Sequence, residues 1–327
     1  MIEVMTMEFL GHPIGGNLVL APMAGVTDYA FRTICAQLGA AVTVTEMVSS
    51  RALVYQDKKS RALLRKNEGS LCGAQIFGND PEVMAQAAVL ALEYSDCDFI
   101  DINMGCPMPK IANNGDGSAL MKDIPLACQI VSAVKKAVSV PVTVKTRLGW
   151  DKGSIHVVEM AKALEQAGAD AIAVHGRTKT MLYSGVADWD EIGKVVKAVN
   201  IPVIANGDIV SPEAAIRCRN HTGAALYMLG RGCFGDPWLF EQINTAFQGE
   251  PIPERPPLCD RIDLALRQFE LNCEDKGEHI ACLEARKHFA WYLRGVPHSG
   301  YYKEKISHLS DAEGVHSVAK AIKRDLR

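Results

Sequence analysis

The sequence predicts an α/β fold, a (β/α)8 TIM barrel followed by a C-terminal all-helical domain. Three observations carry this prediction. Eight β-type runs alternate with helix-like segments, the last part of the chain has helical periodicity alone, and a proline-rich segment separates the two parts. Strict alternation favours a parallel sheet covered by helices, and eight units in about 240 residues favour a barrel over a doubly wound sheet.

The predicted strands are short runs rich in Val, Ile, Leu and Ala, bounded by turn residues or helix starts. They span residues 18–23, 41–47, 71–77, 99–103, 141–147, 171–175, 202–206 and 225–229.

Helix-like segments follow most of these strands, and several carry start signals. Thr27, Asp80, Asp123 and Ser211 fit the N-cap role, and prolines 81 and 212 fit the first turn. The predicted helices span residues 28–38, 81–94, 124–138, 155–167, 188–199 and 212–218.

The domain boundaries follow from composition. The barrel pattern stops near residue 248, and four prolines lie within a short segment after it. We therefore expect a barrel domain at 1–248, a linker at 249–257 and a small helical bundle at 258–327. Helical periodicity in the bundle covers 262–273, 280–293 and 315–326.

Composition narrows the class of protein. The ten cysteines are scattered, with neither a Cys-x-x-Cys pair nor a His-Glu-x-x-His motif, so we expect reduced thiols and no metal site. No apolar run approaches the ~18 residues of a membrane span, which predicts a soluble, cytoplasmic protein without membrane contact. The net charge of −3 excludes an overall basic surface but leaves room for a local basic groove.

Cys106 is the first candidate for chemistry. Alternation puts Asp101 and Asn103 on one face of a short strand, and Cys106 follows its carboxyl end, where barrel enzymes keep their active sites. The thiol could be a nucleophile, a metal ligand, a proton donor or a small buried hydrophobe. The connection from residue 104 to 122 is long and contains Pro and Gly, which indicates a functional loop or a tolerated surface insertion.

Other polar groups are predicted at the same rim. Lys145 lies mid-strand on the interior face, where an internal salt bridge and a bound anionic cofactor are equal alternatives. His175 and Gln75 end their strands, and a single such histidine is more often a core residue. Convergence of Gln75, Asn103, Cys106, Lys145 and His175 on one rim favours an active site.

The last two strands end in glycine-containing loops, Asn206-Gly207-Asp208 and Gly230-Arg231-Gly232, at the usual barrel position for a phosphate. Residues 230–235 also match Gly-x-Gly-x-x-Gly. We reject a dinucleotide-binding unit there, because the linker and helices follow instead of a second strand.

Taken together, the motifs resemble those of bacterial tRNA-dihydrouridine synthases of the B type over nearly the whole chain. The resemblance rests on their order and spacing. They are the segments 21–28, 45–47, 101–107, 117–120, 145–147, 175–178, 205–209, 230–232 and 286–288, with Gln75, Trp291 and Tyr292. One slight departure is Ile111, where Val is usual.

The resemblance implies an FMN enzyme that reduces the C5–C6 bond of tRNA uridines with NADPH, or NADH, as reductant. It implies that Cys106 is the general acid and that Asn103 and His175 contact uracil or flavin. The residues that match FMN-binding positions are Pro22, Met23, Ala24, Gln75, Lys145, Asn206, Gly207, Asp208, Gly230 and Arg231, with His175 as a further candidate.

The resemblance also implies that the helical domain binds tRNA. Arg286, Lys287, His288 and Arg294 recur at helical spacing and could bind phosphates, although a solvated helix face has the same pattern. The low aromatic content of 6% favours recognition of shape and backbone. No protein partner is implied, and we expect a monomer.

Two other functions remain open at this point. One is a flavin barrel that acts on a free base, as dihydroorotate and dihydropyrimidine dehydrogenases do, but it would give the helical domain no task. The other is a tRNA-binding protein or folding chaperone with a vestigial redox site, against which the intact Cys106 and Lys145 speak.

Overall fold

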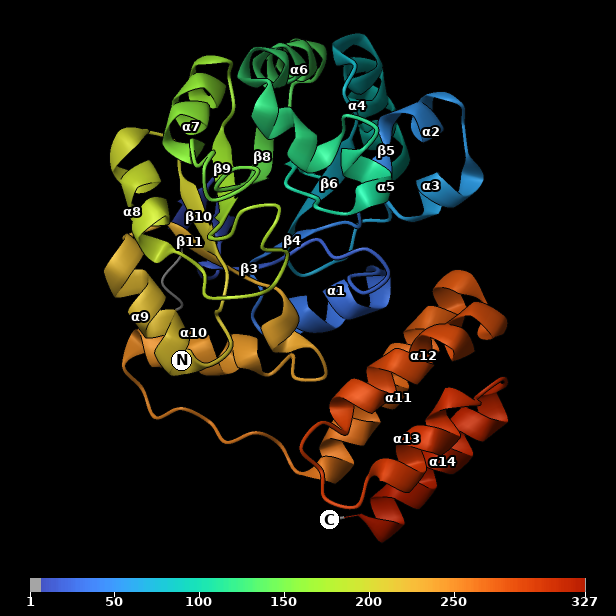
Figure 1. Ribbon diagram of the computed structural model, residues 1–327. Coiled ribbons are helices and arrows are strands. Elements are labelled where there is room, and N and C mark those ends of the chain that lie inside the picture. The colour runs from blue at the N-terminus through green and yellow to red at the C-terminus, as the bar shows by residue number, and fades with distance from the viewer. Residues whose placement is uncertain (1–6, 327) are drawn as a thin grey trace.

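Eight parallel strands close into a barrel in the computed structural model, which describes residues 7–326 (Figure 1). Each strand pairs with its neighbours in chain order, and the sheet closes because the last strand pairs with the first. All eight predicted strands are confirmed. They are β3 (Leu18–Leu20), β4 (Val42–Val44), β6 (Leu71–Phe77), β7 (Phe99–Met104), β8 (Val142–Arg147), β9 (Ala171–His175), β10 (Val203–Asn206) and β11 (Leu226–Leu229).

The register brings the predicted polar residues to one level. Asn103 on β7 is the pairing partner of Lys145 on β8, and Asn206 on β10 is the partner of His175 on β9. Since parallel strands end at the same edge of a sheet, these four side chains lie near one mouth of the barrel.

Helices surround the barrel, and their starts match local capping chemistry. Asp80, Asp123 and Ser211 cap their helices as predicted. Thr27 was the wrong choice, because Asp28 caps the first helix and accepts a 2.9 Å hydrogen bond from the Phe31 amide. These helices are α1 (Tyr29–Gln37), α4 (Pro81–Ser95), α6 (Ile124–Ala137), α7 (Val157–Gln166), α8 (Trp189–Ala198), α9 (Pro212–Thr222) and α10 (Leu239–Gln248).

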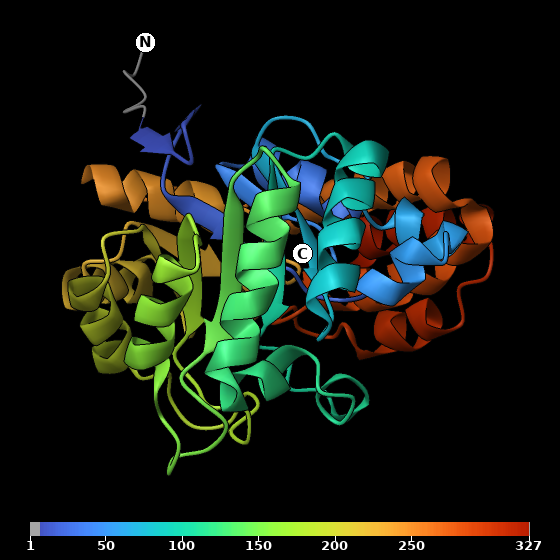
Figure 2. The same ribbon diagram turned by 90° about the horizontal axis from the view of Figure 1, so that it is seen from above.

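Several short elements have no counterpart in the sequence prediction. The hairpin of β1 (Met7–Phe9) and β2 (His12–Ile14) packs Phe9 and Ile14 among the inward residues at the amino end of the barrel. Figure 2 shows this hairpin at the end opposite the long loops. The others are β5 (Val48–Ser49), α2 (Ser50–Val54), α3 (Lys58–Ala62), α5 (Pro109–Ala112), η1 (Gly117–Lys122) and η2 (Arg231–Cys233).

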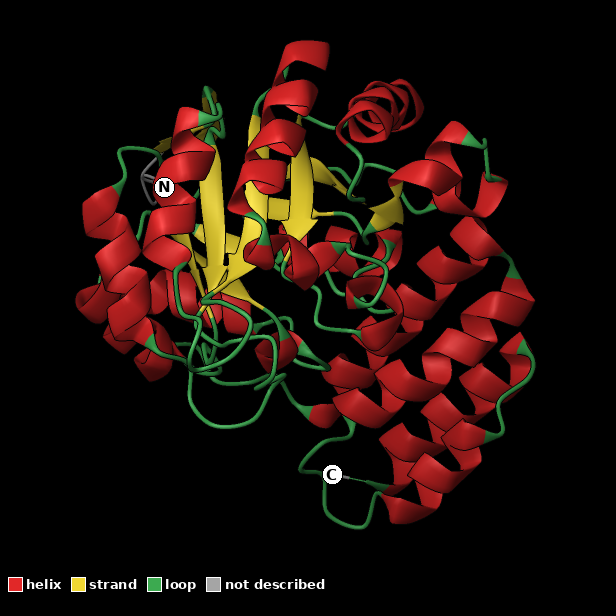
Figure 3. Ribbon diagram, turned by 45° about the horizontal axis from the view of Figure 1, so that its top comes forward, coloured by secondary structure: helices red, strands yellow, loops and turns green. Residues whose placement is uncertain are grey.

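Four helices follow the barrel and form a bundle beside it, without a strand between them (Figure 3). They are α11 (Leu258–Lys276), α12 (Glu278–Tyr292), α13 (Gly300–Ser307) and α14 (Ala312–Asp325). The bundle has its own apolar core, which includes Ile262, Phe289 and Ile322. The domain ranges 1–248 and 258–327 include residues 1–6 and 327, which lie outside the described residues.

The helical bundle packs on the barrel through α11 and α1. None of the helices within residues 7–326 is long and apolar enough to cross a membrane.

Candidate active site

A cavity of about 820 Å³ opens at the carboxyl ends of the barrel strands. Its volume lies within the range of small-molecule and cofactor sites. The strand-end loops bring nearly all of the predicted site residues to its wall. Those that line it are Pro22, Met23, Ala24, Asn103, Cys106, Lys145, His175, Asn206, Gly207, Asp208, Gly230 and Arg231.

Gln75 is the one predicted cofactor-binding residue that does not line this cavity. It is fully buried below the rim, where its Nε2 donates to Asp101 Oδ2 at 2.6 Å and its Oε1 accepts from Asn103 Nδ2 at 2.9 Å. Burial raises the pKa of the Asp101 carboxyl, while hydrogen bonds from Gln75 and Thr143 lower it. Gln75 therefore orients the Asn103 carboxamide from beneath.

Cys106 is held at the cavity wall by backbone contacts. Its N–H donates to Asn103 Oδ1 at 2.9 Å, and its carbonyl accepts from the Ser118 amide at 3.1 Å. Burial raises the pKa of the thiol above its usual value, with a smaller opposing effect from Arg147 and Lys145. A protonated thiol suits proton donation better than nucleophilic attack or metal binding, both of which need the thiolate.

The loop after Cys106 is ordered by short helices, α5 and η1, which occupy much of the 104–122 connection. Gly117 has φ +58°, and a Cβ there would lie 3.1 Å from the Cys106 Cβ. The close approach of this glycine fixes the thiol-bearing turn against the loop.

Lys145 is a half-buried cation in the wall of the cavity. Its Nζ donates to Asn206 Oδ1 at 3.3 Å, and within residues 7–326 it makes no salt bridge. Burial, and then the charge of Arg147, lower its pKa to about 8, while Asp101 opposes them. The internal salt bridge, one of the two alternatives for Lys145, is therefore not formed within the described residues, and the bound anionic cofactor stays a prediction.

His175 is neutral in this environment. Burial, followed by the charges of Arg147 and Lys145, lowers its pKa well below the usual range. The ring is buried, and its centroid lies 6.5 Å from that of Tyr183 on the loop after β9. A neutral imidazole can donate from one ring nitrogen and accept at the other.

Further arginines line the cavity that the site prediction did not include. Arg147 and Arg177 join Lys145, Arg231 and Arg294, which was predicted as a tRNA contact, while Asp208 is the only carboxylate among the lining residues that the structure describes. Arg147 and Arg177 stand within the motifs Lys145-Thr146-Arg147 and His175-Gly176-Arg177, so the signal was present in the sequence. The excess of positive charge suits a multiply charged anion.

Arg177 contributes an unpaired donor to this cavity. It is 2% exposed, and its Nη2 lies 2.8 Å from Asp208, but its Nη1 has no hydrogen-bond partner among residues 7–326. A buried guanidinium donor without a partner is costly, which fits a ligand that would supply an acceptor here.

The two glycine loops approach each other closely beside these cations. A Cβ on Gly207, which has φ +125°, would lie 2.7 Å from the Ala187 Cβ, and one on Gly232 would lie 2.6 Å from the Ile209 carbonyl oxygen. Side chains at these positions would disrupt the packing of the loops. The bare backbone and nearby cations fit a phosphate.

The four basic residues predicted to contact RNA differ in position. Arg286 donates from Nε and Nη2 to the Leu309 carbonyl at 2.9 and 2.7 Å, which ties α12 to the end of α13. His288 is 3% exposed and packs against Phe31 and Trp291, so its side chain is not available to a phosphate. Arg294 is exposed at the mouth of the cavity, and Lys287 contacts the barrel.

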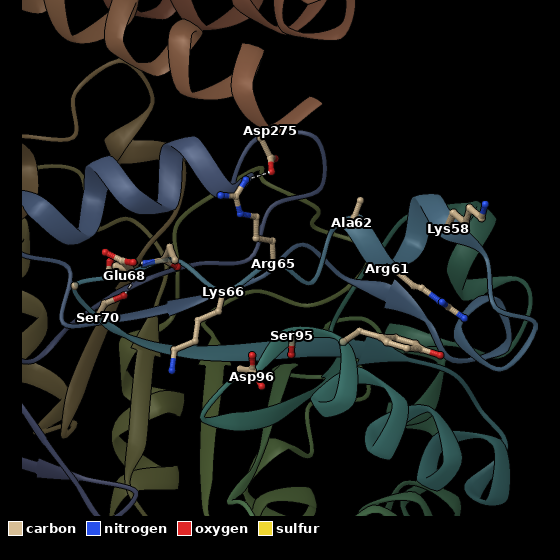
Figure 4. Close-up of a pocket in the computed structure, with 13 residues that line it drawn as sticks. Lys58, Arg61, Ala62, Arg65, Lys66, Glu68, Ser70, Ser95, Asp96 and Asp275 are labelled. Atoms are coloured by element: carbon tan, nitrogen blue, oxygen red, sulfur yellow. Dashed lines mark hydrogen bonds and ion pairs between the residues drawn. The ribbon is translucent and has the colours of Figure 1, made fainter. Parts of the chain in front are cut away.

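A second depression, of about 1030 Å³, lies at the amino ends of β6 and β7 (Figure 4). Its cations are largely paired. Arg65 forms a 2.5 Å ion pair with Asp275, and the Arg61 guanidinium lies 4.1 Å from the Tyr94 ring centroid. Because barrel chemistry is located at the carboxyl ends of the strands, we assign no function to this depression.

Comparisons with known proteins agree with this geometry. The family profile described as dihydrouridine synthase (Dus) matches residues 19–326. The chain is 40% identical to a probable tRNA-dihydrouridine synthase of Rickettsia conorii, over 91% of this chain and 90% of that one. It is 42% identical to tRNA-dihydrouridine synthase B of Pseudomonas putida, over 92% and 90%.

Solved structures support the fold. A histamine dehydrogenase from Rhizobium sp. 4-9 matches with a TM-score of 0.60 and 14% identity, over 83% of this chain and 51% of that one. A 2-naphthoyl-CoA reductase matches with a TM-score of 0.59 and 14% identity, over 76% and 52%. This chain thus spans about half the length of these two proteins, and the likeness shows the barrel fold alone.

Proposed function

Because the chain belongs to the dihydrouridine synthase family and makes dihydrouridine in tRNA, we propose that Cys106 protonates the uracil that a bound FMN reduces. The observation that carries this proposal is one cavity whose described lining holds a protonated thiol, several cations and a single carboxylate. The activity is that of a flavin-dependent oxidoreductase.

The residues of the cavity fit FMN. The Arg177 Nη1 donor without a partner among residues 7–326, together with Arg231 and the close glycine loops, suits the phosphate. Lys145 suits the negative charge of a reduced isoalloxazine, and residues 22–24 form the adjoining wall. When bound, FMN supplies hydride for C6 of uracil after its own reduction by NADPH, which we propose as the reductant.

Cys106 then completes the reduction. Hydride addition at C6 leaves negative charge at C5 and O4 of the uracil, and the thiol gives its proton to C5. The thiol must be protonated before this step, and its burial favours that form.

Asn103 and His175 orient the base. Asn103 Oδ1 already accepts from the Gly105 and Cys106 amides, and one Nδ2 hydrogen goes to Gln75. The remaining Nδ2 hydrogen, which has only a 3.6 Å contact with the Met47 sulfur, is the group we propose for a uracil carbonyl. Neutral His175 can donate to a second uracil oxygen.

The substrate reaches the cavity as part of tRNA. A uridine in folded tRNA must leave its stack to reach a group at the carboxyl ends of the strands. We propose that residues 258–327 form the tRNA-binding domain, with Arg294 at the cavity mouth as a phosphate contact. We propose a monomer as the active form.

Purified protein tests the proposal directly. It should be yellow or bind added FMN, NADPH should bleach the flavin, and tRNA lacking dihydrouridine should restore the colour. Free uridine should not restore it, since it lacks the contacts to the helical domain. A protein that neither retains nor rebinds FMN would contradict the cofactor assignment.

A further inference from the structure

Helix α12 of the helical domain contacts the wall of the catalytic cavity at two separate places. One is the segment 22–27 between β3 and α1, of which Pro22, Met23, Ala24 and Val26 line the cavity. The other is the turn that follows η2, where Phe234 lines the cavity. The first segment holds residues that we assign to the flavin site, and the second follows the loop 230–232 that we assign to its phosphate, so the bundle supports two walls of the cavity.

The first contact is a hydrogen bond from the Lys287 ammonium to the Gly25 carbonyl oxygen. On the other side of the same residue, the Gly25 amide donates to the carboxylate of Glu46, which is buried in the barrel. Gly25 has φ +72°, and a Cβ there would lie 3.6 Å from Lys287 Nζ. The two polar groups of one glycine are therefore held by two different domains.

The second contact is aromatic. The rings of Phe234 and Trp291 stack with centroids 4.4 Å apart. Gly235, at φ +68°, lies so close to α12 that a Cβ would be 2.2 Å from the Trp291 carbonyl carbon. Trp291 is one helical turn beyond Lys287, so one face of α12 reaches both walls.

We propose that Lys287 is a positioning residue for the flavin pocket and not an RNA contact. From the helical domain, it fixes the segment 22–27 that forms part of the pocket wall. The inference rests on the flavin site proposed above. A charge-assisted hydrogen bond to a carbonyl is stronger than a neutral one, and here it acts on backbone two residues from Met23.

The other hydrogen bonds of the segment close its turn, since the Val26 and Thr27 amides donate to the Met23 carbonyl at 2.9 and 3.0 Å. Within the described residues, Thr27 closes a turn by accepting from the Met23 amide at 2.8 Å, and Arg32 donates to the Thr27 carbonyl at 2.6 Å. These bonds fix the ends of the turn, while Glu46 and Lys287 fix its tip. Loss of the Lys287 ammonium leaves the tip tied on the barrel side alone.

The test compares Lys287→Met with Lys287→Arg, which keeps a cationic donor. FMN affinity is measured by titration of the apoprotein, and flavin reduction by NADPH is followed by stopped-flow absorbance. Lys287→Met should weaken FMN binding by about tenfold, the scale of one charge-assisted hydrogen bond, and should change the visible spectrum of the bound flavin. Lys287→Arg should restore much of the affinity.

Arg65→Met is the matched control, because Arg65 also joins the two domains through its 2.5 Å ion pair with Asp275 but does not line the cavity. It should leave FMN affinity and spectrum unchanged. Wild-type flavin properties in Lys287→Met, whatever happens to tRNA affinity, would overturn the positioning role. Failure of the wild-type protein to bind FMN would instead contradict the flavin site itself.

Discussion

The carboxamide oxygen of Asn103 accepts a 2.9 Å hydrogen bond from the backbone amide of Cys106. The orientation of this carboxamide is fixed from the other side, since its nitrogen donates to Gln75, which in turn donates to Asp101. A buried chain of side-chain hydrogen bonds thus runs from the barrel interior to the turn that carries the thiol. The position of the Cys106 thiol, the proposed proton donor, is thus set by the barrel core.

Replacing Cys106 with Ala should separate the two halves of the reaction. The flavin needs no thiol to accept hydride from NADPH, so FMN binding and flavin reduction should stay near wild-type. Reoxidation by unmodified tRNA should slow by about 10²-fold or more, the usual scale for loss of a general acid. Rapid mixing of the pre-reduced variant with tRNA measures this step, and a wild-type rate would show that another group protonates C5.

The lysine in the cavity predicts a pH dependence of flavin binding. Without a ligand, Lys145 has a pKa of about 8, lowered from 10.5 by burial and by Arg147. An anionic ligand favours the ammonium, so FMN affinity should fall as the pH rises through about 8. In Lys145→Met that fall should be absent and the affinity at pH 7 lower. Titrations between pH 6.5 and 9.5 compare the two, and identical profiles would exclude Lys145 as the charge that holds the cofactor.

Two arginines of the helical domain should respond differently to mutation. Arg294 is exposed at the cavity mouth, so Arg294→Met should weaken tRNA binding and reduce its salt dependence by about one unit of slope or less. Arg286 is bound to the Leu309 carbonyl, so Arg286→Met should lower stability by about 1–3 kcal/mol and leave the salt slope unchanged. Filter binding at several salt concentrations measures tRNA affinity and its salt slope for both variants. A reduced slope in Arg286→Met and an unchanged slope in Arg294→Met would assign the RNA contact to Arg286 instead.

The interface histidine predicts a loss of stability in acid. Burial lowers the pKa of His288 to about 4 from an ordinary 6.5, against the opposing charge of Asp28. The unfolded chain therefore binds more protons than the folded chain between pH 6.5 and 4. As the pH falls through that window, the free energy of unfolding decreases by on the order of 3 kcal/mol. His288→Phe keeps a ring against Phe31 and Trp291 and removes the titration, so its urea midpoint should fall less over the same range. If the urea midpoints of the wild-type protein and His288→Phe fell equally with pH, His288 would not be a buried neutral imidazole.

The capping and helical-domain predictions show where local sequence is sufficient. Asp80, Asp123 and Ser211 could be assigned from residue type and spacing, because a cap depends on backbone within one helical turn. Thr27 and Asp28 are both acceptable caps by that criterion. In the structure the Thr27 hydroxyl accepts from the Met23 amide, and Asp28 caps the helix while it also forms a 2.9 Å ion pair with Lys276 of the helical domain.

The sequence by itself determined the eight strands, their order and the grouping of Asn103, Cys106, Lys145 and His175 at one rim, because alternation and parallel strand ends are properties of the chain. Only the tertiary structure decided what the basic residues of 286–294 do. Helical spacing gives Arg286, Lys287, His288 and Arg294 similar standing, yet packing buries His288, binds Arg286 to a carbonyl and directs Lys287 to Gly25. Contacts between residues more than 250 positions apart depend on how the two domains dock, and that information is absent from any local pattern.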